Sequence, residues 1–86
     1  MTNSQVMANF ARALPAYGSN LSTDGLVLRS YNQEIARWDK GMCILANYCA
    51  GGVYISQTTS KHVGMVYRHV PKNLIKLVHP YDYDAA

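Results

Sequence analysis

The sequence predicts an α+β fold, in which a small antiparallel sheet of three to four strands packs against two α-helices. Apolar residues recur at helical spacing near the N-terminus and again after residue 57, and runs rich in Val, Ile and Leu lie between these two stretches. With 86 residues, 49% of them hydrophobic and 15% charged, the chain fits a single small domain over residues 1–86. We expect an N-terminal helix over about 2–14, the sheet over about 26–56 and a second helix over about 58–70.

The N-terminal helix has a recognisable start and end. Thr2 precedes Gln5 by three residues, which is the spacing of a capping box. Pro15 is expected to end the helix, because proline cannot continue the hydrogen-bond ladder and restricts the residue before it. The apolar side of the helix is predicted from residues spaced i, i+3, i+4 and i+7, namely Met7, Phe10, Ala11 and Leu14.

Residues 16–25 have the composition of a loop, and Asp24-Gly25 marks a turn. The next stretch, residues 26–38, has the composition of a strand but is interrupted by Asn32-Gln33. Two strands joined by a tight turn and one bent strand therefore both stay open.

Residues 41–50 form a further apolar strand candidate, and Gly51-Gly52 follows it. Because glycine tolerates positive φ, this pair favours a hairpin into residues 53–56. Near the C-terminus, a short strand or helical turn is expected to return four apolar residues to the core: Leu74, Ile75, Leu77 and Val78.

The second helix is predicted with Ser56 or Thr58 as its N-cap and with Pro71 after its end. Val63, Val66, Tyr67 and Val70 form its apolar stripe and should face the sheet. We expect the three valines to pack against Ile44 and against Val53 or Ile55.

The polar residues of this second helix form the candidate site. At 100° per residue, Lys61, Arg68 and Lys72 fall on one side, and His62 falls with Met65 and His69 on the adjoining side, off the valine stripe and largely exposed. The hydroxyls at the positive end of the helix either cap it or help to hold an anion. The residues predicted to bind a partner or an anion are Thr58, Thr59, Ser60, Lys61, His62, Arg68 and Lys72.

The distribution of charge supports an anionic partner. The formal net charge is +3, and no acidic residue lies between Asp39 and Asp82. This acid-free stretch carries five cations, Lys40, Lys61, Arg68, Lys72 and Lys76. Such a pattern suits binding to an anionic surface, and a merely solvated face is the alternative.

Neither a metal, a cofactor nor a catalytic activity is predicted. Cys43, Cys49, His62 and His69 include both zinc-binding residue types, but five residues separate the cysteines and six separate the histidines, which is wider than zinc fingers favour. Nucleotide-binding and hydrolase motifs are absent from the sequence. The sequence has neither a signal peptide nor an apolar run of the roughly 20 residues that span a bilayer, so we expect a cytoplasmic protein with two free thiols.

Two segments carry a family resemblance. Ser30-Tyr31 is followed by Ile35-Ala36, and later Tyr54 and Ser56 lead into Thr58-Thr59-Ser60-Lys61-His62. Over about residues 26 to 70 the chain resembles an uncharacterised group of small bacteriophage and mobile-element proteins, whose members read approximately SYxTxIA and then YSxTTSKH. The chain departs from this signature at Asn32-Gln33 and by one extra residue between Tyr54 and Ser56.

This resemblance implies a small accessory protein of a phage or mobile element, acting in the host cytoplasm. Two function classes follow. One is an anti-defence inhibitor, similar to anti-CRISPR proteins, that binds a host protein or nucleoprotein complex; the other is a nucleic-acid-binding module that uses the basic helix face. A membrane is not an expected partner, and the oligomeric state, a homodimer included, stays open.

Overall fold

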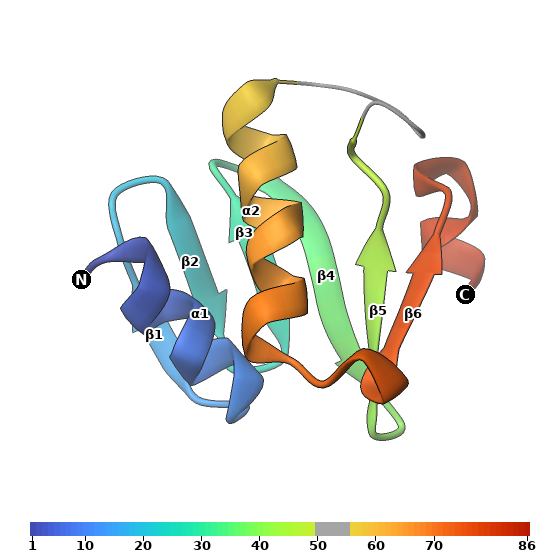
Figure 1. The fold of residues 1–86 in the computed structure, drawn as a ribbon, viewed down its shortest axis with the longest axis horizontal. Coiled ribbons are helices and arrows are strands. Elements are labelled where there is room, and N and C mark those ends of the chain that lie inside the picture. The colour runs from blue at the N-terminus through green and yellow to red at the C-terminus, as the bar shows by residue number, and fades with distance from the viewer. Residues whose placement is uncertain (50–55) are drawn as a thin grey trace.

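A six-stranded sheet runs through the computed structural model, which describes residues 1–49 and 56–86, with its strands side by side in the order of the sequence (Figure 1). The first five strands form an antiparallel meander, and β6 pairs in parallel with β5. The strands are β1 (Pro15–Tyr17), β2 (Leu21–Asp24), β3 (Val27–Ser30), β4 (Gln33–Asp39), β5 (Met42–Ala46) and β6 (Ile75–Val78).

Two α-helices, α1 (Asn3–Ala11) and α2 (Gln57–His69), lie on the same face of this sheet (Figure 1). Two 3₁₀ helices, η1 (Lys72–Leu74) and η2 (Pro80–Ala85), flank β6. The α+β class is confirmed, while the sheet has more strands than the three to four predicted and is mixed rather than antiparallel. Within residues 1–49 and 56–86, the helices are too short and too polar to cross a membrane.

The predicted capping box at the start of α1 is confirmed: Thr2 Oγ1 accepts from the Gln5 N–H, and the Gln5 side chain accepts from the Thr2 N–H. The predicted end of the helix is wrong. Ala13 adopts a left-handed φ of 58°, its N–H donates to the Phe10 carbonyl, and the Leu14 N–H donates to the Asn9 carbonyl. This Schellman arrangement ends α1 at Ala11, before Pro15 can act, and leaves Leu14 exposed.

The stretch predicted as loop, residues 16–25, contains most of β1 and all of β2. Hydrophobic and polar residues do not alternate clearly here, because small and polar residues occupy some of the buried positions. Ala16 and Thr23 are buried, as is Leu21. Farther on, the two-strand alternative is confirmed, since β3 and β4 are joined at Tyr31, which has a φ of 56°.

The main core lies between the two helices and the sheet. Val63, Val66 and Val70 are buried there as predicted, together with Ile35 and Leu45. Ile44 was predicted to meet the valines, but it points to the other face of the sheet. Side chains alternate along a strand, so an error of one position in β5 exchanges the two faces.

Part of the predicted hairpin falls outside the described residues: Gly51-Gly52, Val53 and Ile55 belong to the segment 50–55. In the described chain, β5 has β4 on one side and β6 on the other. Leu74 and Ile75 pack against the main core as predicted, and Val78 packs against a smaller cluster, while Leu77 is exposed.

That smaller cluster holds the C-terminal segment against the far face of the sheet. Tyr83 of η2 packs on Ile44 and Ala46. The Tyr83 hydroxyl donates to Glu34 Oε2 at 2.6 Å, and the guanidinium of Arg37 lies 4.4 Å from the Tyr83 ring centroid. Arg37 also donates to the backbone oxygens of Tyr83 and Ala86 at 2.9 Å each. The C-terminal segment, which carries Asp82 and Asp84, is therefore anchored on the face opposite to α2.

Candidate functional site

The outer side of α2 carries two of the predicted cations. Lys61 and Arg68 are exposed, two helical turns apart, and thus separated by about 10 Å along the axis at a rise of ~1.5 Å per residue. Together with Gly64 and Met65 they line a groove of about 340 Å³. No acidic residue occurs on α2, so no carboxylate of the helix itself neutralises these charges.

The third predicted cation does not belong to this helical face. α2 ends at His69, Val70 is extended, and Lys72 lies in η1. The helical angle of 100° per residue does not apply to Lys72, because the chain leaves the helix at Val70 and Pro71, before it reaches Lys72. Lys72 is exposed and carries its charge close to the C-terminal end of α2 in sequence, outside the groove.

His62 was predicted to be largely exposed, and this prediction is wrong. The side chain is 1% exposed, and its Nδ1 lies 2.6 Å from the hydroxyl of Ser30 on β3. The amide nitrogen of Asn3 lies 3.3 Å from its Nε2. Since that amide donates to Nε2, Nδ1 carries the proton and donates to Ser30. Burial lowers the pKa of His62 below its ordinary value of 6.5.

The hydroxyls at the start of α2 are used within the fold. Ser56, the first of the two predicted cap candidates, accepts the Thr59 N–H at 3.1 Å. Thr59 is buried, and its hydroxyl accepts from Ser56 and lies 3.4 Å from Ser30. Ser60 donates to the carbonyl of Tyr48 at 2.9 Å. Thr58 is half-buried. The polar run thus caps the helix and attaches it to β3 and to the segment after β5.

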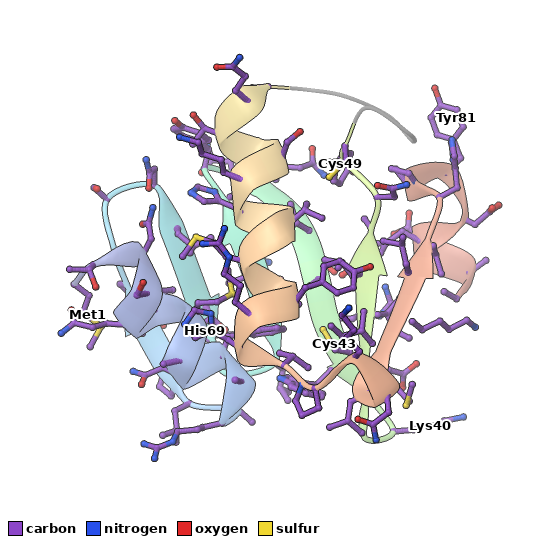
Figure 2. All side chains as sticks on the ribbon, viewed as in Figure 1. Met1, Lys40, Cys43, Cys49, His69 and Tyr81 are labelled. Atoms are coloured by element: carbon purple, nitrogen blue, oxygen red, sulfur yellow. The ribbon has the colours of Figure 1, made fainter. Side chains whose placement is uncertain are left out.

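Six of the seven predicted site residues therefore divide into two groups, and the half-buried Thr58 belongs to neither. Lys61, Arg68 and Lys72 point to solvent and are available to a partner. Thr59 and His62, with Ser60, hold α2 on the sheet. Figure 2 shows His69 on the part of α2 beside α1, where its Nδ1 donates to the Met65 carbonyl at 3.1 Å.

Ser30 and His62 form a pair whose side chains, in an open cleft, would resemble a nucleophile and its base. Neither is open to solvent: Ser30 is 0% exposed and His62 is 1% exposed. A substrate carbonyl cannot reach the Ser30 hydroxyl in this conformation. The pair is a buried polar connection between β3 and α2.

The cysteines lie apart. Figure 2 shows Cys43 and Cys49 toward opposite ends of the segment that contains β5, and both thiols are free. Burial raises the pKa of Cys43 to about 12, which keeps it protonated and unreactive at neutral pH. Among residues 1–49 and 56–86, three or more potential metal ligands do not come together.

Two lining residues of the groove were not among the predicted site residues: Gly64, which sequence reasoning missed, and Met65, which helical angles had placed only on the side adjoining the cations. α2 is continuous through Gly64, and a glycine at the centre of a helix was the signal that could have drawn attention to this position. Sequence reasoning also missed Ser30 as the partner of His62, because 32 positions separate them and only the fold brings them together.

The sequence matches no protein-family model, and comparison with curated proteins and with solved structures finds no significant match.

Proposed function

We propose that this protein is a small accessory protein of a phage or mobile element, which binds a host protein or nucleoprotein complex in the cytoplasm and inhibits it. The contact is made by the outer face of α2, defined by Lys61, Gly64, Met65 and Arg68, with Lys72 adding charge beyond the helix. The observation that carries the proposal is the exposure of Lys61 and Arg68 on either side of a groove, on a helix without acidic residues.

Binding rather than catalysis is supported by the polar residues. The Ser30–His62 pair is closed to solvent, and the outer groove contains no carboxylate, histidine or thiol among its lining residues. Lysine and arginine in such a groove supply attraction and orientation, without a group suited to general acid–base work near pH 7.

A protein surface suits this face better than bare nucleic acid. Only two cations line the groove, and the third lies beyond the helix. Proteins that bind DNA through its phosphates use many more cations, commonly about six to ten phosphate contacts. A basic nucleic-acid-binding module is the second candidate, and it predicts a different result in the same experiment.

The test is capture of partners from a bacterial host lysate, with and without nuclease, on immobilised protein. The matched variants are Lys61→Glu/Arg68→Glu, which reverses the charge of the groove, and Lys40→Glu/Lys76→Glu, which changes the net charge equally away from α2. We expect a specific host protein that survives nuclease treatment, is lost with the first variant and is retained by the second. Loss of all capture after nuclease would favour the nucleic-acid module instead. Equal capture by both variants would contradict a role for this face.

A further inference from the structure

Gly64 has no function within the described part of the molecule that would require glycine. It lies in the eighth position of a 13-residue helix, with ordinary helical backbone. Apart from its two chain neighbours and the nearby backbone of the helix itself, a Cβ built on it would meet no heavy atom within 4 Å. Gly18 and Gly25 differ in this respect, since a Cβ there would come within 3.0 Å of a backbone oxygen. Glycine inside a helix is destabilising relative to alanine, so Gly64 weakens α2 without relieving a clash.

The position of Gly64 in the groove suggests what the glycine is for. It lines the groove together with Lys61, Met65 and Arg68, and because it is exposed, the missing side chain leaves the helix backbone open to solvent. Glycine lets another chain approach the helix backbone closely, whereas a large side chain at this position would occupy part of the groove. The helix is thus notched on the side that faces away from the sheet.

We propose that this notch receives an apolar side chain of an acidic protein segment, and that the acidic residues on either side of that chain pair with Lys61 and Arg68. This inference rests on the proposed function and specifies the chemistry of its partner. The apolar group lies over the Gly64 backbone and against the thioether of Met65, a flexible and polarizable side chain common on binding surfaces.

The chemistry of the groove favours such a segment over a phosphate backbone. Met65 is half-buried and packs partly against the main core, and a phosphate chain would use the two cations while leaving the exposed part of Met65 and the bare helix backbone uncovered. An acidic segment with one large apolar residue contacts all four lining residues. Its acids pair with Lys61 and Arg68, and its apolar side chain lies on Gly64, on Met65 and on the aliphatic stems of the two cations. The separation of about 10 Å between the two cations along the axis sets the spacing of the acids.

A displayed library of random 12-residue peptides, selected on the immobilised full chain, tests the proposal even before a host partner is identified. Selected peptides are then measured against the wild type, Gly64→Leu, Gly64→Ala and Lys61→Glu/Arg68→Glu. Ala8→Leu is the matched control, since it adds the same kind of bulk to an exposed position of α1. A 20-base-pair DNA duplex is measured in parallel.

We expect the selected peptides to share a large apolar residue between acidic residues. Gly64→Leu and the charge-reversal variant should each weaken their binding at least tenfold, and Ala8→Leu should leave it unchanged. Gly64→Ala should weaken binding less, while it raises the Tm of the free protein by roughly 4–8 °C, because alanine is the better helix former. This gain shows that the loss of binding does not come from unfolding.

Failure to enrich acidic peptides would overturn the proposal, as would equal binding by Gly64→Leu and the wild type, or tighter binding of the DNA duplex than of any peptide. The proposed function fails separately. If charge reversal abolishes host-protein capture while Gly64→Leu retains it, the basic face stands and the notch does not. If both variants retain capture, both proposals fail.

Discussion

The hydroxyl of Ser30 lies 2.6 Å from Nδ1 of His62, across 32 positions of the chain and with both side chains excluded from solvent. This hydrogen bond joins β3 to α2. Asn3 extends it from His62 to α1, and Thr59 lies beside Ser30. The buried polar side chains of the described residues all have hydrogen-bond partners. The connection therefore fixes the orientation of α2, and with it the direction in which Lys61 and Arg68 point.

Replacing Ser30 with alanine should destabilise the protein by about 1–3 kcal/mol, because His62 Nδ1 would then be buried without its partner. The free energy of unfolding is measured by urea denaturation. Ser22→Ala on the neighbouring strand is the matched control, since Ser22 faces the opposite side of the sheet beside Arg29. Equal stability of Ser30→Ala and Ser22→Ala would contradict the assigned role of the Ser30–His62 bond.

The stability should depend on pH through His62. Burial lowers the pKa of this residue in the folded state below the ordinary value of 6.5, so the unfolded chain binds the proton more readily. The contribution of His62 is fully present above pH about 6.5 and is lost as pH falls below that value toward the folded-state pKa.

Urea denaturation at several pH values between about 5 and 8 measures this loss. His62→Gln keeps a hydrogen-bonding side chain but cannot titrate, so its free energy of unfolding should change less over the same range. Asp24 does not contribute to the pH dependence in this range. Backbone N–H donors lower the pKa of its exposed carboxyl from 3.8, so its titration changes the stability only at more acidic pH. The same pH slope in His62→Gln and the wild type would assign the effect to another group.

Ala13→Gly should stabilise the protein by about 1 kcal/mol. Ala13 ends α1 at a φ of 58°, a conformation that is unfavourable for alanine and readily adopted by glycine. This variant is the reverse of Gly64→Ala, in which alanine replaces glycine at ordinary helical φ. Thermal denaturation of the two single variants should show a rise in Tm for each. A lower Tm for Ala13→Gly would show that the left-handed cap does not hold in solution.

Strong periodicity and local chemistry made much of the fold predictable. The capping box at Thr2, the valine stripe of α2 and the Ser56 cap depend on residues close in sequence, and all three are present. The missed features depend on contacts between distant residues. β6 completes the sheet by pairing in parallel with β5, which lies about thirty positions earlier in the chain. No local sequence pattern predicts that pairing.

The C-terminal segment offers a matched pair of tyrosines. Tyr83 is 5% exposed and donates to the Glu34 carboxylate, whereas Tyr81 is 84% exposed. Tyr83→Phe should cost about 1.5–3 kcal/mol, the range for hydrogen bonds to charged groups, and Tyr81→Phe should change the stability by less than about 0.5 kcal/mol. Denaturation of the two variants side by side measures the difference. Similar values for the two would mean that η2 is not docked on the sheet.

The positions of the charged side chains of the candidate site were predictable from the sequence, whereas the burial of its polar side chains was not. Helical angles placed Lys61 and Arg68 on the outer face, and the structure keeps them there. The same angles put His62 on a neighbouring side that the sequence shows as polar, yet α1 and β3 cover it. Whether a polar helix side is covered depends on where the other elements pack, which the periodicity of one helix does not reveal.

The salt dependence of partner binding tests the central claim most directly, namely that the outer face of α2 contacts an anionic surface. The captured host partner is titrated with the wild type and with Lys61→Ala/Arg68→Ala/Lys72→Ala from low salt to about 0.5 M. Exposed charges contribute little to folding, so the variant should stay folded. We predict slower association for it and a much flatter dependence on salt, because steering acts within a Debye length of ~8 Å at physiological ionic strength. Equal affinity of the two proteins at every salt concentration would contradict the claim.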